Sequence, residues 1–318
     1  MGKRLTVFFV VLAAAVAAAV LFTRPPGRPP MTRLAVASIR PIADIASNVA
    51  GERFEVRCLL PPGASPHTFE PTTQQIVDLS SAQLFLEVGL DLEMWAPALV
   101  KSAANPGLKI VTVSAGITPA RFGDHGGERA AEGAGDAAGE EHGLWDPHVW
   151  MDPVLALRIV ENVRAAFAEA DPEGAAGYAE RAAAYSAKLR ELDADYARVI
   201  AALPVKKVVA FHDAYAYMAG RYGIEIVGVV EEAPGKEPGA RHIQELIRRI
   251  RTSGAGAVMV EPQFSPRMAE SIARDAGVRV ATIDPIGDES DPRRSTYLDM
   301  MRFNLESIRT AGTPEGAR

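Results

Sequence analysis

The sequence YAERAAAYSAKLRELDADYARVIAAL, residues 178–203, predicts one long helix that decides the fold. Its apolar side chains recur alternately every four and three residues, which places them on one face of a helix. They are Tyr178, Ala182, Tyr185, Leu189, Leu192, Tyr196, Val199 and Leu203. At about 1.5 Å per residue the helix spans roughly 38 Å, enough to run the length of a protein with two lobes. An amphipathic helix on the surface of one domain would carry the same pattern.

Short apolar strands alternate with helices on both sides of this segment. Four predicted strands precede it, at residues 34–38, 54–60, 82–89 and 108–114, and four follow it, at 207–211, 224–230, 257–260 and 278–283. Such alternation is typical of a parallel sheet with helices on its faces. We therefore expect an α/β fold of two lobes, each a mostly parallel sheet flanked by helices. The lobes are residues 34–170 and 204–318, joined by one long rigid connecting helix at 171–203.

Composition and charge exclude several classes of protein. The chain has 318 residues, of which 48% are hydrophobic and 23% charged, as in ordinary soluble globular proteins. The net charge is −6 and the basic residues form no cluster, so we expect no nucleic acid partner. Cys58 is the only cysteine, which excludes an intramolecular disulfide and a cysteine-based zinc cluster.

The N-terminal residues 1–33 have the pattern of a targeting segment. Lys3 and Arg4 precede an apolar run, Leu5–Phe22, and a proline-rich spacer follows it. This order predicts a secretory signal peptide or an uncleaved N-terminal membrane anchor. We therefore expect the remaining chain to be exported and periplasmic.

A segment rich in glycine, alanine and acidic residues occupies positions 121–142. Its sequence is RFGDHGGERAAEGAGDAAGEEH, and it has no apolar periodicity. We expect this acidic loop to be mobile.

The sequence GLWDPHVWMDP, residues 143–153, follows the acidic loop and holds one histidine between two Asp-Pro steps. Proline fixes its own φ and restricts the residue before it. Asp152 has the position of a helix N-cap, with Pro153 as the first helical residue. His148 therefore lies on a stiffened loop, where it could hold a ligand or be a surface histidine in a turn.

Four polar residues, His67, His148, His212 and Asp284, each follow the C-terminal end of a predicted strand. In open α/β sheets this edge is where ligands bind. His67 and His148 come from the first lobe, and His212 and Asp284 from the second. The fold would therefore bring all four together in the cleft between the lobes.

Three neutral imidazoles and one carboxylate complete the tetrahedral coordination of a metal such as Zn²⁺. Taken singly, each histidine also fits a structural or surface role, and Asp284 fits a turn or a helix cap. Glu261 ends the predicted strand 257–260 and offers a second carboxylate. It could replace or supplement Asp284, or it could accept a hydrogen bond from a ligating histidine.

The chain resembles a known family, the cluster A-I metal-binding proteins of bacterial ABC importers, above all the periplasmic zinc-binding type. The resemblance covers nearly all of residues 34–312. It is carried, in the family's order, by the motifs PGASPHTFEPTTQQIVDL, DPHVWMDP, DPEGAAGYAERAAAYSAKLRELD, VVAFHDAYAYMAGRYG, VEPQFS and TIDPIG.

The resemblance implies a binding protein that captures one zinc ion per chain and delivers it to the membrane permease of an ABC importer. His67, His148 and His212 match the family's histidine ligands, and Asp284 matches its carboxylate. The protein would then be a monomer and not an enzyme. Binding of manganese or iron by the same fold is the first alternative, and a zinc-dependent hydrolase with Glu261 as its base is a less favoured one.

Overall fold

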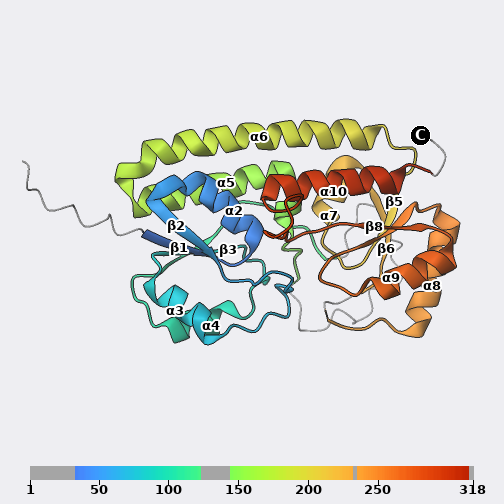
Figure 1. Ribbon diagram of the computed structural model, residues 1–318, viewed down its shortest axis with the longest axis horizontal. Coiled ribbons are helices and arrows are strands. Elements are labelled where there is room, and N and C mark those ends of the chain that lie inside the picture. Colours follow the sequence, from blue (N-terminus) through green and yellow to red (C-terminus); the bar gives the residue numbers. More distant parts are fainter. Residues whose placement is uncertain (1–32, 123–143, 232–234, 315–318) are drawn as a thin grey trace, which may run out of the picture. The chain divides into compact units, whose positions relative to one another are not determined.

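Helix α6, Ala175–Ala201, runs past two four-stranded sheets (Figure 1). The computed structural model describes residues 33–122, 144–231 and 235–314. The predicted apolar stripe is buried from Tyr178 to Tyr196, but Ile200 rather than Val199 continues it. A step of four residues from Tyr196 advances about 400° around the axis, so position 200 returns close to the same face.

The two sheets have the same strand order. In spatial order, the first sheet contains β2 (Phe54–Cys58), β1 (Arg33–Ala37), β3 (Leu84–Glu87) and β4 (Lys109–Thr112). The second sheet contains, in the corresponding order, β6 (Glu225–Val229), β5 (Lys207–Ala210), β7 (Ala257–Val260) and β8 (Arg279–Thr282). β3 pairs in parallel with β1 and with β4. The three pairs of the second sheet are also parallel. The predicted α/β fold with two parallel-sheet lobes is confirmed.

Helices flank both sheets. In the first lobe they are α2 (Arg40–Ala50), α3 (Thr73–Ser81), α4 (Ala96–Ala103) and α5 (Pro153–Ala170), and in the second α7 (Ala216–Tyr222), α8 (Ala240–Ser253), α9 (Pro266–Ala276) and α10 (Tyr297–Gly312). Helix α6 packs against α2 and α5 of the first lobe and against α7 and α10 of the second. It therefore links the lobes over most of its length.

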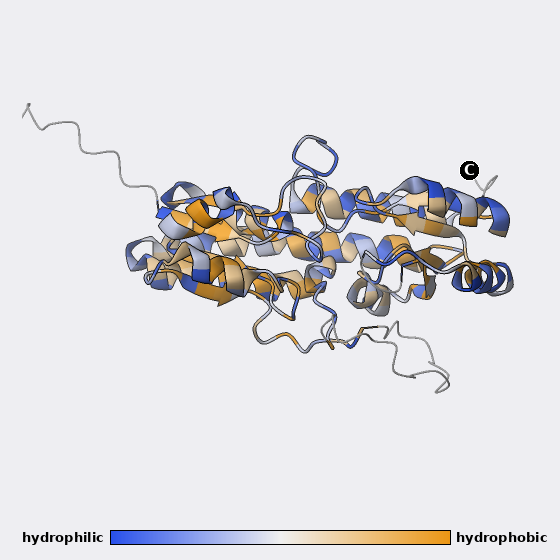
Figure 2. Cartoon of the chain, turned by 90° about the horizontal axis from the view of Figure 1, so that it is seen from below, coloured by the Kyte–Doolittle hydropathy of each residue, from blue (hydrophilic) through white to orange (hydrophobic). Residues whose placement is uncertain are grey.

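Side chains on both faces of the central strands β1 and β3 are buried, and successive strand residues point to opposite faces. In β1, Ala35 and Ala37 belong to a core that also contains the buried face of α6, whereas Leu34 and Val36 pack on the opposite face. The core around α6 continues without interruption from one lobe into the other. Figure 2 shows hydrophobic strands and helices with one hydrophilic and one hydrophobic side.

Direct hydrogen bonds also join the lobes beside α6. Trp150 is fully buried in the short helix Val149–Met151, and its indole Nε1 donates to the carbonyl of Pro285 at 2.7 Å. The hydroxyl of Tyr297 donates to the carbonyl of Trp150 at 2.7 Å. Because these groups are buried, separating the lobes here would leave them without partners.

One helix begins later than the sequence predicts. The sequence of residues 92–100 predicts a helix, but α4 begins only at Ala96. Leu90 and Asp91 have left-handed φ angles of 55° and 63°, and the carboxylate of Glu93 accepts hydrogen bonds from two backbone amides of this turn. The carboxylate therefore stabilises a tight turn in place of the first helical turn.

Two predictions concern segments outside the described residues. The signal or anchor segment 1–33 and the acidic loop 121–142 lie there, apart from Arg33, Arg121 and Phe122. In the described part of the chain, no helix combines the length and apolar character needed to cross a membrane.

Candidate metal centre

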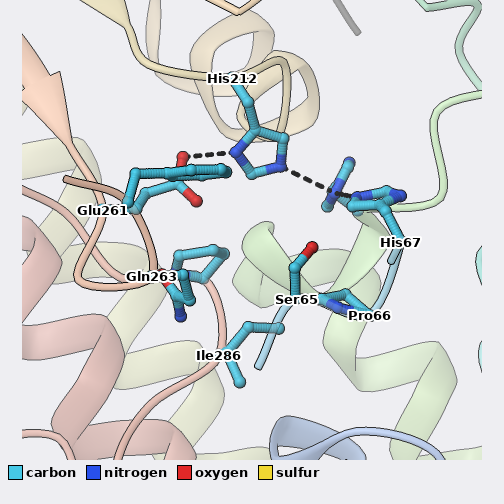
Figure 3. A pocket seen from close by; sticks show the side chains of 10 residues that line it. Ser65, Pro66, His67, His212, Glu261, Gln263 and Ile286 are labelled. Carbon is cyan, nitrogen blue, oxygen red and sulfur yellow. Dashed lines mark hydrogen bonds and ion pairs between the residues drawn. The ribbon is translucent and has the colours of Figure 1, made fainter. Parts of the chain in front are cut away.

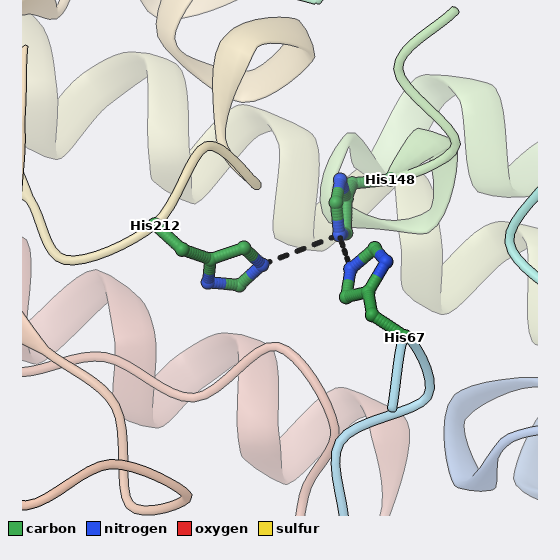
Figure 4. Close-up of side chains that lie close together, drawn as sticks. All are labelled: His67, His148 and His212. Atoms are coloured by element: carbon green, nitrogen blue, oxygen red, sulfur yellow. Dashed lines mark hydrogen bonds between the residues drawn. The ribbon is translucent and has the colours of Figure 1, made fainter. Parts of the chain in front are cut away.

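Three of the four residues predicted to form the site lie together. His67 is in the loop between β2 and α3, His148 precedes the short helix Val149–Met151, and His212 follows β5. One ring nitrogen from each lies within 4.8 Å of the other two. Nε2 of His148 is 3.1 Å from Nε2 of His67 and 3.4 Å from Nε2 of His212 (Figure 4). Imidazole nitrogens at these separations converge on one point, as ligands of a shared ion do.

The cluster opens into a small pocket between the lobes. His148 and His212 are 1% and 5% exposed, and His67 is half-buried. The pocket is lined by Ser65, Pro66, His67, His148, His212, Glu261, Gln263, Phe264, Pro285 and Ile286 (Figure 3). An ion held here would be largely removed from water, which strengthens its interaction with the surrounding groups.

Asp146 fixes the ring of His148. Its Oδ1 accepts the backbone N–H of His148 at 2.9 Å and lies 2.7 Å from the ring Nδ1. Nδ1–H therefore donates to the carboxylate, and Nε2 is left to face the other two imidazoles. By itself, the step Asp146-Pro147 predicts only a turn. The spacing Asp-Pro-His, with an acceptor two residues before the ligand, was the signal that could have revealed this contact.

Glu261 fixes His212 in a similar way. Its Oε1 lies 2.5 Å from Nδ1 of His212, and both side chains are buried (Figure 3). The carboxylate thus contacts the nitrogen that is turned away from the cluster. This is the hydrogen-bonding role that the sequence offered as one alternative for Glu261.

The surroundings of the two buried imidazoles move their pKa values in opposite directions. Burial, followed by the charge of His212, lowers the pKa of His148 well below its ordinary value. Burial also disfavours a charged His212, but Glu261 outweighs it and raises the pKa of His212. His148 is therefore neutral, as a metal ligand must be, whereas a metal has to displace a more firmly held proton from the pair of His212 and Glu261.

His67 depends on Trp95 for its position. The indole Nε1 of Trp95 donates to the carbonyl of Pro66 at 3.1 Å, and the Trp95 ring meets Phe69 edge to face at 5.0 Å. These contacts hold the loop on both sides of His67. This role could not be predicted from the sequence, because Trp95 lies 28 residues beyond His67 on the turn before α4.

The fourth predicted residue, Asp284, does not join the cluster. Among the described residues the group able to hold a metal consists of the three histidines. Oδ1 of Asp284 accepts the backbone amides of Ile286 and Gly287, each at 2.9 Å, and Oδ2 pairs with the guanidinium of Arg294. The carboxylate is thus held by the loop that follows β8.

The chain thus has two parallel-sheet lobes joined by a long helix, with a largely buried three-histidine cluster between them. The family model described as "Zinc-uptake complex component A periplasmic" (ZnuA) matches residues 35–311. The chain belongs to this family.

Individual relatives are moderately similar in sequence. The zinc-binding protein AdcA of Streptococcus pyogenes serotype M3 is 29% identical over 283 residues, which are 86% of this chain and 55% of that protein. The high-affinity zinc uptake system protein ZnuA of Bacillus subtilis is 27% identical over 277 residues, 86% of either chain. The chain thus spans about half the length of the streptococcal relative.

Solved structures share the fold. A crystal structure of ZnuA superposes with a TM-score of 0.77 at 28% identity, covering 89% of this chain and 100% of that one. A ZnuA mutant lacking residues 138–173 of its own numbering, solved with zinc bound, has a TM-score of 0.76 at 27% identity and covers 89% and 99%.

Proposed function

We propose that this chain is an extracytoplasmic solute-binding protein that captures Zn²⁺ and delivers it to the permease of an ABC importer. The observation that carries the proposal is the convergence of Nε2 from His67, His148 and His212 at the pocket between the lobes. Relatives named for zinc binding and zinc uptake support the choice of metal. We propose a periplasmic monomer without a nucleic acid partner, with lobes at 34–170 and 204–318 and the connection at 171–203.

The donor atoms favour zinc over manganese. Imidazole nitrogens suit Zn²⁺, whereas Mn²⁺ prefers carboxylate, carbonyl and water oxygens. The two carboxylates that the sequence offered as oxygen donors are engaged, Glu261 with His212 and Asp284 with Arg294. Three nitrogens are thus the donors most readily offered to an incoming ion.

The proposal includes no catalytic step. A zinc hydrolase needs a carboxylate free to act as a base on a metal-bound water. Glu261, the candidate for that role, accepts a hydrogen bond from the ring of His212. A carboxylate in this position orients a ligand, as in many zinc sites.

Competition with a chromophoric chelator tests the zinc site. The wild-type chain should bind one equivalent of zinc, and the double variant His148→Ala, His212→Ala should lose at least about a hundredfold in affinity, since two of three ligands are removed. His242→Ala is the matched control, because His242 lies on α8 and contacts the carbonyl of Val229. Unchanged affinity in the double variant would refute the proposal.

A further inference from the structure

The carboxylate of Asp284 is held by four donors. Oδ1 accepts the backbone amides of Ile286 and Gly287 and also the side-chain amide of Gln263 at 3.3 Å, and Oδ2 pairs with Nη1 of Arg294. The backbone of Asp284 is fixed as well, because its N–H donates to Asn304 at 2.8 Å and its carbonyl accepts from Asn304 at 2.7 Å. Asp284 is completely buried. Oδ1 therefore accepts three hydrogen bonds, and Oδ2 is engaged by the guanidinium of Arg294.

Arg294 is itself anchored from several sides. Its Nε lies 3.0 Å from Oδ2 of Asp291 and its Nη2 lies 3.5 Å from Oδ2 of Asp288. The guanidinium also lies 5.8 Å from the ring centre of Phe303, and the side chain is 12% exposed. A planar guanidinium fixed in this way presents Nη1 to Asp284 in one orientation.

Asp284 nevertheless directly precedes, in the sequence, two residues that line the metal centre. The two residues that follow it, Pro285 and Ile286, line the pocket together with the three histidines. Because Asp284 lies outside the three-histidine group, its carboxylate would have to move to contact an ion bound there. Such a movement would break its ion pair with Arg294 or its hydrogen bonds to the amides of its own loop.

We propose that Arg294 determines metal specificity by withholding Asp284 from the bound ion. The inference rests on the proposed function, since it concerns the same site. With Asp284 held, the protein offers three imidazole nitrogens and leaves the fourth position to water, a donor set that favours Zn²⁺. With Asp284 released, the site would gain a hard, charged oxygen that favours Mn²⁺.

Two variants test whether Asp284 is withheld from the bound ion or is one of its ligands. Asp284→Asn keeps an oxygen that can accept the amides of Ile286 and Gly287 but removes the charge of the carboxylate. Arg294→Met removes the guanidinium and releases Oδ2 of the carboxylate. Arg293→Met is the matched control, because Arg293 is adjacent, 72% exposed and paired with Asp291.

Zinc and manganese affinities and the visible spectrum of the Co²⁺ form are measured for each protein. We expect Asp284→Asn to stay within about twofold of wild type in zinc affinity, whereas loss of a true ligand would cost about tenfold or more. Arg294→Met should gain about tenfold in manganese affinity and shift the Co²⁺ spectrum, and adding Asp284→Asn should reverse both changes.

A tenfold loss of zinc affinity in Asp284→Asn, with an altered Co²⁺ spectrum, would overturn the inference. The proposed function of zinc binding would still stand. An Arg294→Met protein that folds and matches wild type in spectrum and manganese affinity would also overturn it. If Arg294→Met fails to fold, Asp284→Asn decides the question by itself. A wild-type chain that binds no zinc would refute the proposed function, and this inference with it.

Discussion

Oδ1 of Asp146 contacts one residue, His148, at two points: the backbone N at 2.9 Å and the ring Nδ1 at 2.7 Å. A single carboxylate oxygen thus sets both the backbone turn and the orientation of the imidazole. Asp146 is completely buried, so this arrangement is shielded from competing water. The direction of Nε2 therefore depends on a residue that does not itself join the cluster.

Replacing Asp146 should weaken zinc binding without abolishing the fold. We expect Asp146→Ala to lower zinc affinity by about 10- to 100-fold, the usual effect of removing a carboxylate that orients a histidine ligand. Asp146→Asn should recover part of the loss, because its amide oxygen can accept the same two hydrogen bonds. Chelator competition measures the affinities, and thermal unfolding of the metal-free proteins serves as the control. Equal affinities for Asp146→Ala and wild type would contradict this role.

Trp95→Phe tests the support of His67. The phenyl ring can keep the contact with Phe69, but the hydrogen bond to the carbonyl of Pro66 is lost. A typical hydrogen bond contributes about 1 kcal/mol, so we expect zinc affinity to fall about fivefold if the loop must be ordered for binding. Stopped-flow release of zinc to a chelator should be faster by a similar factor. An unchanged release rate would mean that the His67 loop needs no support from Trp95.

Stability should depend on pH through Glu93, whose carboxylate accepts the amides of Val88 and Gly89. Burial raises the pKa of Glu93 to about 7 from an ordinary 4.5. An acid with a raised pKa stabilises the fold below its unfolded pKa, and this contribution is lost as pH rises through the folded pKa. The free energy of unfolding of wild type relative to Glu93→Gln should therefore fall between about pH 4.5 and 7, by up to about 3 kcal/mol.

Urea unfolding of the metal-free proteins at several pH values checks this prediction. Glu180→Gln, an exposed change on α6, is the control and should follow wild type. A constant difference between wild type and Glu93→Gln across this range would show that Glu93 does not titrate there.

Most of the fold could be predicted from the sequence because its elements follow from periodicity. The stripe on 178–203 and the alternation of strands and helices require no knowledge of distant contacts. The turn at Leu90 and Asp91 was missed because left-handed φ angles at residues other than glycine leave little trace in a sequence. This turn is stabilised by hydrogen bonds to the carboxylate of Glu93, which only the structure reveals.

Part of the candidate site could also be predicted from the sequence, and part could not. The three histidines could be predicted to meet because parallel strands present their carboxyl ends at one edge. The pairing of Asp284 with Arg294 could not be predicted, because it depends on the course of the loop between β8 and α10. The role of Asp146 was hidden because Asp-Pro also has an ordinary place in turns.

Anomalous diffraction at the zinc edge from crystals of the zinc-loaded protein would locate the bound ion and its ligands. We expect a single strong peak between the lobes, about 2.0–2.1 Å from Nε2 of His67, His148 and His212. Asp146 and Glu261 should still contact the opposite ring nitrogens of His148 and His212. A peak elsewhere on the chain, or one that leaves any of the three imidazoles out of contact with the metal, would show that the three histidines do not form the zinc site.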